Sequence, residues 1–285
     1  MRLYLDTANL EEIKEAVSWN IIDGVTTNPS LIKKAILKLR ESDIKVDIES
    51  YIKKILAAVG RMCPVSLEVA DLTADEMIEQ GMLLFEKFNQ VAGNVVIKIP
   101  VCTVNSEGKG QLFDGLVAIQ ALSDEKIPVN ATLIFTPEQA FLAAKAGADY
   151  VSPFVGRVDD RIRGKAGIHF EKTDYFPAAG MHNTSGPENV ITDQGLVSGV
   201  DLVARIVDIF DQYEIPCEII AASIRNSIQV REVAETGADI VSMPFDILKS
   251  MITHPGTAAG IDGFTSDLVD EYMALFSPRK EGEVR

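Results

Sequence analysis

The segment NVVIKIP (94–100) shows how the chain is organised, because it is one of eight short apolar runs that are typical of buried β-strands. Amphipathic stretches of ten or more residues separate these runs, which is the pattern of repeated βα units around a parallel sheet. The eight runs are RLYLD (2–6), IDGVTT (22–27), PVSLEVA (64–70), NVVIKIP (94–100), PVNATLIF (128–135), DYVSPF (149–154), CEIIAAS (217–223) and DIVSMP (239–244).

This spacing predicts the α/β class, with one eight-stranded parallel β/α barrel of the TIM type over residues 1–285 that ends in a C-terminal helix. An open, doubly wound sheet is the alternative, but no Gly-x-Gly-x-x-Gly motif follows the first run. The stretches AAKAGADYVS (143–152) and VAETGADIVS (233–242) repeat one helix-to-strand junction about 90 residues apart, as expected of repeated units.

Composition narrows the class of protein. With 42 acidic and 27 basic side chains the net charge is −15, which argues against nucleic acid or an anionic membrane surface as a partner. No apolar run approaches the length of a membrane span, and the N-terminus lacks the pattern of a signal peptide. The three cysteines have no metal-type spacing and are expected to be reduced thiols. We therefore expect a cytoplasmic protein.

Two segments break the regular spacing. Residues 101–111 (VCTVNSEGKGQ) form a polar connection longer than a minimal βα turn. Residues 158–198 show little helical periodicity and many turn residues, so we expect an insertion after the sixth strand, on the face of the barrel where chemistry occurs. His169, His182 and Asp174 lie in this insertion, but without paired spacing they do not predict a metal site.

Polar residues recur within the apolar runs. Because side chains alternate along a strand, residues two apart share a face. One reading is that these residues face outward or are ordinary hydrogen-bonded groups. The other is that they gather in one site. An uncompensated buried charge costs several kcal/mol, so buried charged groups are expected near one another. The residues are Asp6, Glu68, Lys98, Asn130, Thr132 and Ser152.

Lys98 stands among Val96, Ile97, Ile99 and Val101. Apolar walls disfavour its ammonium form, and a neutral amine can attack a carbonyl to form a Schiff base. That adduct permits carbon–carbon cleavage without a metal or an organic cofactor. A base and a proton shuttle are also needed, roles that suit carboxyl groups. The alternative is a strand-end lysine whose ammonium group reaches solvent.

Two arginines follow the sixth and seventh runs. Arg157 comes after SPFVG, and Arg225 comes after AASI with Ser223 beside it. Guanidinium groups and hydroxyls at barrel strand ends often bind phosphate. In a chain this acidic the pair predicts a phosphate pocket, with surface salt bridging as the alternative.

The motifs DGVTTNPSL (23–31), VVIKIP (95–100), SPFVGR (152–157) and AASIR (221–225) resemble transaldolases, including the short transaldolase and fructose-6-phosphate aldolase branch. The segments LYLDTAN, VSLEVAD and VNATLIF are similar as well, and the match runs in order over most of residues 1–255. The resemblance implies an eight-stranded β/α barrel with a Schiff-base lysine on strand four, and no metal or cofactor.

The resemblance also implies roles for individual residues. Lys98 would form the imine, Asp6 would be the base for the C4 hydroxyl, and Glu68 with Thr132 would hold a catalytic water. The remaining residues would bind substrate: Asn28, Asn130, Ser152 and Phe154 at the dihydroxyacetone unit, and Arg157, Ser223 and Arg225 at the phosphate.

Glu68 and Phe154 help to choose between the two branches of the family. Fructose-6-phosphate aldolases have glutamine and tyrosine at these positions, whereas transaldolases have glutamate and phenylalanine. We therefore expect a transaldolase of the pentose phosphate pathway. It would move a dihydroxyacetone unit from fructose 6-phosphate or sedoheptulose 7-phosphate to an aldose phosphate. The alternatives are an aldolase of altered substrate and a non-catalytic barrel that binds sugar phosphates.

Two features bear on assembly and specificity. Ordinary short transaldolases lack anything like residues 158–198, so this insertion could alter the choice of acceptor, act as a lid or build a subunit contact. A C-terminal helix at residues 257–277 resembles the segment that joins short transaldolases into rings. We therefore expect a homo-oligomeric ring, a pentamer or a decamer.

Overall fold

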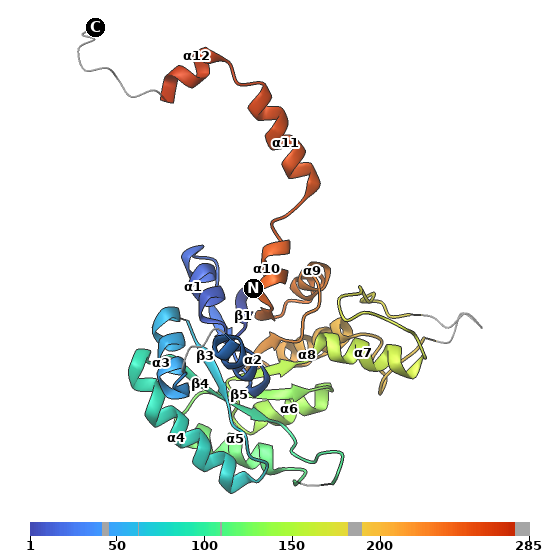
Figure 1. Cartoon of the computed structure of the whole chain (residues 1–285). Coiled ribbons are helices and arrows are strands. Elements are labelled where there is room, and N and C mark those ends of the chain that lie inside the picture. Colours follow the sequence, from blue (N-terminus) through green and yellow to red (C-terminus); the bar gives the residue numbers. More distant parts are fainter. Residues whose placement is uncertain (42–45, 62, 109, 182–189, 277–285) are drawn as a thin grey trace. The chain divides into compact units, whose positions relative to one another are not determined.

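The computed structural model describes residues 1–41, 46–61, 63–108, 110–181 and 190–276. They fall into two compact units, Met1–Leu248 and Lys249–Arg285. The first unit is a closed barrel of parallel strands in the order β1 to β8 (Figure 1). Its strands are β1 (Arg2–Asp6), β2 (Gly24–Thr26), β3 (Val65–Glu68), β4 (Val95–Pro100), β5 (Val129–Ile134), β6 (Tyr150–Pro153), β7 (Glu218–Ala221) and β8 (Ile240–Met243). Each apolar run contains one of them, so the predicted barrel is confirmed.

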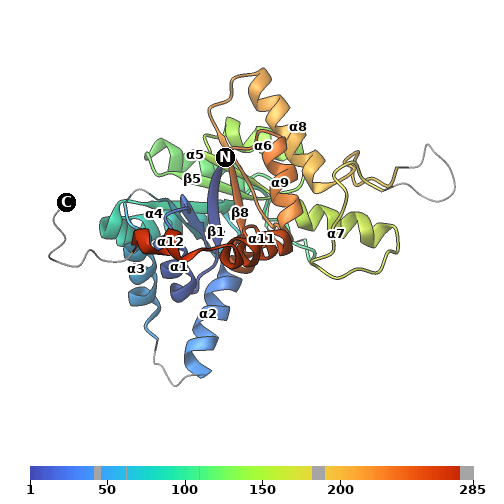
Figure 2. The same cartoon turned by 90° about the horizontal axis from the view of Figure 1, so that it is seen from above.

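Helices surround the strands, as Figures 1 and 2 show. Polar caps begin several of them: the side chains of Asn9, Thr73 and Asn226 each accept a backbone N–H of the first turn. The helices that begin in the first unit are α1 (Leu10–Ser18), α2 (Pro29–Glu41), α3 (Ile48–Val59), α4 (Ala74–Ala92), α5 (Asp114–Asp124), α6 (Pro137–Lys145), α7 (Val155–Lys165), α8 (Gly199–Gln212), α9 (Ser227–Glu235) and α10 (Phe245–Ser250), whose last two residues belong to the second unit.

Side chains alternate along each strand between the core outside the barrel, where the helices pack, and the interior of the barrel. In β4, Val95, Ile97 and Ile99 belong to the main apolar core, which includes the buried faces of the helices. Tyr4 belongs to a smaller, separate cluster and precedes Asp6 by two residues, so both side chains point into the barrel. The interior is thus apolar at the level of Tyr4 and polar at the level of Asp6.

The segment after β6 differs in part from the expectation. Residues 158–165 are helical, because α7 runs from Val155 to Lys165. The irregular insertion expected from residue 158 is therefore wrong for this first part. Val155, Val158 and Ile162 are the buried side of the helix, at spacings of three and four that the intervening charged residues obscure. In the described residues of 166–198 no further helix or strand is present.

The connection after β4 is irregular, as expected. Thr103 closes it on itself, because its Oγ1 accepts a hydrogen bond from the Gln111 N–H at 3.2 Å and donates to the Gln111 carbonyl at 3.1 Å.

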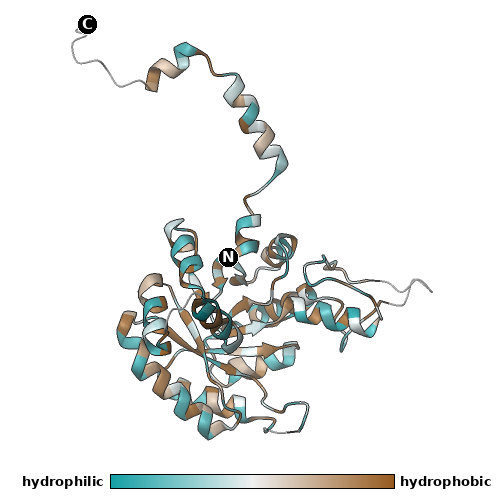
Figure 3. Ribbon diagram, in the orientation of Figure 1, coloured by the Kyte–Doolittle hydropathy of each residue, from teal (hydrophilic) through white to brown (hydrophobic). Residues whose placement is uncertain are grey.

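The second unit contains short helices rather than the single helix expected at 257–277. Helix α11 (Pro255–Ser266) is followed by α12 (Asp270–Met273) and the 3-10 turn η1 (Ala274–Phe276). The break comes at Val269, whose backbone is extended. No residue of α11 or α12 is buried, and hydrophobic residues occur along both helices in Figure 3. In neither unit do the described residues include a helix long and apolar enough to cross a membrane.

Candidate active site

A pocket of about 700 Å³ opens at the carboxyl ends of the barrel strands. Of the eleven residues singled out from the sequence, nine line it: Asp6, Asn28, Glu68, Lys98, Ser152, Phe154, Arg157, Ser223 and Arg225. The other two, Asn130 and Thr132, are fully buried on β5. Residues that are far apart in the sequence therefore converge because parallel barrel strands end at one face.

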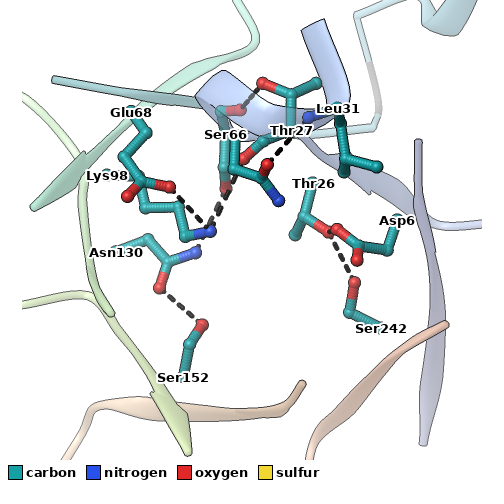
Figure 4. A network of polar contacts seen from close by, with 11 residues as sticks. Asp6, Thr26, Thr27, Leu31, Ser66, Glu68, Lys98, Asn130, Ser152 and Ser242 are labelled. Carbon is teal, nitrogen blue, oxygen red and sulfur yellow. Dashed lines mark hydrogen bonds and ion pairs between the residues drawn. The ribbon is translucent and has the colours of Figure 1, made fainter. Parts of the chain in front are cut away.

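Lys98 and Glu68 face each other on neighbouring strands. The register of β3 and β4 pairs Glu68 with Lys98, and Lys98 Nζ lies 3.1 Å from Glu68 Oε2 (Figure 4). Lys98 Nζ also lies 3.5 Å from the Thr27 carbonyl oxygen. Both ionic side chains are largely buried, with 7% and 16% of their surfaces exposed. The pair therefore offsets the cost of burying either charge alone.

This environment corrects one part of the sequence interpretation. Ile97 and Ile99 belong to the core outside the barrel, so they do not surround the amine. The amine instead meets a carboxylate and a carbonyl oxygen, so its surroundings are polar. A carbonyl attack by Lys98 would therefore need a proton acceptor, and Glu68 is within reach of the proton.

Asn130 is fixed by two serines. Ser152 Oγ donates a hydrogen bond to Asn130 Oδ1 at 2.8 Å, and Asn130 Nδ2 donates to Ser66 Oγ at 3.2 Å. The register of β4 and β5 pairs Asn130 with Lys98. Two positions further along β5, the Thr132 hydroxyl is buried and has no hydrogen-bond partner among the described residues. The amide is thus held beside the amine, and the hydroxyl is free to bind another group.

Asp6 ends β1, and the Thr26 hydroxyl orients its carboxylate. Thr26 Oγ1 donates to Asp6 Oδ1 at 2.8 Å and also contacts Ser242 Oγ (Figure 4). Burial raises the pKa of Asp6 above its ordinary value, although the nearby Lys98 ammonium and the Thr26 hydrogen bond act in the opposite direction. A carboxylate with a raised pKa is a stronger base than an exposed one.

The two arginines follow β6 and β7, as expected, Arg157 in α7 and Arg225 in the loop before α9. Arg157, in the first turn of α7, places its guanidinium carbon 4.9 Å from the centroid of the Phe154 ring. Arg225 Nη2 lies 2.8 Å from Asp160 Oδ2, and the Arg225 backbone N–H donates to Gln229 Oε1 at 2.8 Å. Arg225 is therefore held by an ion pair, while Arg157 is exposed and rests on the Phe154 ring.

The backbone at the start of α7 packs closely against the loop that contains Ser223. Gly156 donates its N–H to the Ser223 carbonyl at 3.0 Å, and a Cβ at Gly156 would lie 2.4 Å from that oxygen and 2.5 Å from Arg225 Cγ. Ser223 itself has a positive φ of 60°, which is uncommon for serine. Glycine is thus required where α7 meets the loop of Ser223 and Arg225.

Sequence reasoning missed several residues that line the pocket or hydrogen-bond to its side chains. Ser66 could have been found, because it precedes Glu68 by two positions and shares its face; Thr26 and Ser242 lie in apolar runs and carry the same signal. Leu133 has a φ of 59° beside a register shift in β5 and lines the pocket. Nothing in its sequence context marks that conformation. Lys34 and Lys172 also line the pocket.

The structure describes only some of the possible metal ligands in the segment 158–198. In the part of the chain that the structure describes, no three His, Cys, Asp or Glu side chains are grouped to hold a metal ion. His182 lies outside the described residues. Asp174 Oδ2 accepts the Glu171 N–H at 2.8 Å, so it serves as a turn-forming carboxylate.

Known proteins are similar to this chain along almost its whole length. The family model described as Transaldolase/Fructose-6-phosphate aldolase matches residues 3–278. A probable transaldolase of Aquifex aeolicus (strain VF5) is 41% identical over 267 residues, covering 94% of this chain and 96% of its own. Probable transaldolases of Hydrogenobaculum sp. (strain Y04AAS1) and Listeria monocytogenes serotype 4b (strain F2365) are each 40% identical over 267 residues, which is 94% of this chain and 96% and 97% of theirs.

Proposed function

The chain belongs to the transaldolase/fructose-6-phosphate aldolase family, and from this premise we propose that it is a transaldolase whose Schiff base forms on Lys98. It would transfer a dihydroxyacetone unit from fructose 6-phosphate or sedoheptulose 7-phosphate to an aldose phosphate, within the pentose phosphate pathway. The observation that carries the proposal is the buried Lys98–Glu68 pair, 3.1 Å apart, in the same pocket as Arg157 and Arg225.

Imine formation begins with loss of a proton from the Lys98 ammonium. Glu68 Oε2, 3.1 Å from Nζ, is placed to accept it. The neutral amine then adds to the ketone carbonyl, and the carbinolamine loses its hydroxyl as water when Glu68 returns the proton, leaving an iminium ion. The Thr132 hydroxyl, buried without a partner among the described residues, supports a water held between Thr132 and Glu68.

Cleavage needs a base at the C4 hydroxyl of the bound ketose. Asp6 would accept that proton, the C3–C4 bond would break, and its electron pair would move into the iminium group to give an enamine. An aldose phosphate leaves with its new carbonyl. The raised pKa of Asp6, caused by burial, supports this role.

The three retained carbons need polar partners. Asn130 and Ser152 are ordered by their mutual hydrogen bond of 2.8 Å. Asn28 Oδ1 accepts the Leu31 N–H at 2.9 Å, so its Nδ2 is the group left to donate to substrate. Arg157, Ser223 and Arg225 would bind the phosphate, since guanidinium forks match its oxygens.

An acceptor assay tests the proposed reaction. Purified protein is given fructose 6-phosphate with and without erythrose 4-phosphate, and the products are separated by chromatography. A transaldolase forms sedoheptulose 7-phosphate and glyceraldehyde 3-phosphate only when the acceptor is present. Cleavage that is equally fast without acceptor would identify an aldolase instead. If the parent binds sugar phosphate yet never turns it over, the barrel is a binding protein.

We also propose that the protein is a cytoplasmic homo-oligomeric ring, a pentamer or decamer, assembled through residues 257–277. Support comes from the second unit, where Phe264, Leu275 and Phe276 are 78%, 74% and 68% exposed, an amount of apolar surface that a subunit contact would cover. Light scattering of the full chain and of a chain ending at Ser250 tests this. A ring that survives the truncation would contradict it.

A further inference from the structure

Lys172 reaches the pocket from a segment that the proposed reaction does not use. It lines the same cavity as Arg157 and Arg225, although it lies in the irregular residues that follow α7. The side chain is exposed, and no carboxylate lies within ion-pair distance of it among the described residues.

Arg163 fastens the turn that carries Lys172. The Arg163 guanidinium carbon lies 4.8 Å from the ring centroid of Phe170 and 5.0 Å from that of Phe176. Its Nη2 donates to the Asp174 carbonyl at 2.8 Å. Arg163 and Phe176 are buried, with 3% and 1% of their surfaces exposed. A guanidinium between two rings, on the same helix as Arg157, therefore anchors both ends of the turn 170–176.

The turn is also tied to α9. Asn226 Nδ2 donates to the Thr173 carbonyl at 3.4 Å, and the Tyr175 hydroxyl donates to Glu232. Asn226 caps α9 and directly follows Arg225. The turn that carries Lys172 is thus attached to the two elements that bear the arginines, α7 and the loop of Arg225.

The two arginines do not by themselves balance the charge of a bound phosphate. A phosphate monoester carries about −1.5 to −2 charges at neutral pH. Arg225 is already paired with Asp160 at 2.8 Å, which offsets part of its charge. Arg157 stacks on Phe154 and has no ion-pair partner among the described residues. One free guanidinium alone does not neutralise a dianion, so a second free cation at this end would strengthen phosphate binding.

Of the two lysines at the pocket, Lys172 is the better placed. Lys34 also lines an adjoining cavity with three carboxylates, Asp6, Glu12 and Asp246. Lys172 is carried by the turn fastened to both arginine-bearing elements.

We infer that Lys172 is the second free cation of the phosphate end, and that the turn 170–176 makes this chain select phosphorylated acceptors. The inference rests on the proposed function and adds a specificity residue to it. Because Lys172 is exposed, its contribution is that of a solvated charge, about three- to tenfold in the preference for a phosphorylated acceptor.

The test compares paired acceptors in Lys172→Met, Lys172→Arg and Lys145→Met. Lys145 is an exposed lysine at the end of α6 that does not line the pocket, so it controls for loss of one surface charge. The ratio of kcat/KM for erythrose 4-phosphate to that for erythrose should fall about three- to tenfold in Lys172→Met. It should be restored by Lys172→Arg and unchanged in Lys145→Met, with equal melting temperatures.

Binding of inorganic phosphate, measured by calorimetry, separates this inference from the proposed function. An active parent whose acceptor ratio and phosphate affinity are the same in Lys172→Met overturns the inference alone. A parent that shows no turnover, yet binds phosphate more weakly after Lys172→Met, overturns the proposed transaldolase activity and keeps Lys172 as an anion-binding residue.

Discussion

The two ends of the pocket are built differently. At the imine end, Glu68 and Lys98 lie on neighbouring strands in register and are largely buried. At the phosphate end, Arg157 and Arg225 come from segments after the strands and depend on contacts such as Gly156 to Ser223 for their position. The barrel thus fixes the reacting groups, while the loops and α7 fix the groups that select the substrate. Changes at the first end should act on kcat, and changes at the second on KM.

The largest effect is expected for Lys98→Arg. This change keeps a cation opposite Glu68 but removes the amine that forms the imine, so kcat should fall at least about a thousandfold with little change in melting temperature. Steady-state transfer assays and thermal unfolding check both. Residual activity above about one per cent of the parent's would show that the imine is not formed on Lys98.

Asp6→Asn should be next, with kcat lowered about a hundredfold or more because the base for the C4 hydroxyl is lost. Imine formation does not use Asp6, so a substrate adduct should still form. In the parent, kcat should fall as pH drops through the Asp6 pKa, which burial raises, since a base must be deprotonated. Single-turnover kinetics across pH separate the steps. Equal losses of adduct and turnover would contradict this role.

Gly156→Ala should act at the phosphate end. The added Cβ would lie 2.4 Å from the Ser223 carbonyl oxygen, so the loop of Ser223 and Arg225 must shift. We expect KM for fructose 6-phosphate to rise about tenfold with a smaller change in kcat. Gly164→Ala is the matched control, because a Cβ on this residue of the same helix meets nothing within 4 Å. If both variants leave KM unchanged, the close contact does not position Arg225.

The smallest effect on turnover is expected for Asp159→Asn. Burial raises the pKa of Asp159 to about 7, and its oxygens accept hydrogen bonds from Gly199 N–H and Gln229 Nε2, each at 2.7 Å. The native state therefore holds this proton more tightly than the unfolded chain. This tighter protonation of Asp159 stabilises the native state fully below pH about 4, and the stabilisation is lost as pH rises toward 7.

Urea unfolding from pH 4.5 to 7.5 measures that loss. The free energy of unfolding of the parent should fall relative to that of Asp159→Asn by about 2 to 4 kcal/mol over this range, while kcat changes less than about twofold. Parallel curves for parent and variant would show that Asp159 is already ionised at low pH.

Much of the barrel was predictable because strand alternation is a local property. The polar residues Asp6, Glu68 and Lys98 stood out inside apolar runs, and all three line the pocket. The same rule points to Ser66, which was overlooked. Two rules are enough to predict these residues: side chains alternate along a strand, and parallel strands end at one face of the barrel.

The phosphate end was less predictable because long-range contacts determine it. The start of α7 was missed, since its charged residues hide the spacing of Val155, Val158 and Ile162. Lys172 reaches the pocket through stacking of Arg163 with Phe170 and Phe176, which no short pattern encodes.

Borohydride trapping shows directly whether Lys98 forms the imine. Parent protein is incubated with fructose 6-phosphate, reduced with borohydride, digested and examined by mass spectrometry. We expect one stable adduct per chain on the peptide that contains Lys98, complete loss of activity, and no adduct in Lys98→Arg. A parent that stays active without a label, or that carries the label on another lysine, would contradict it.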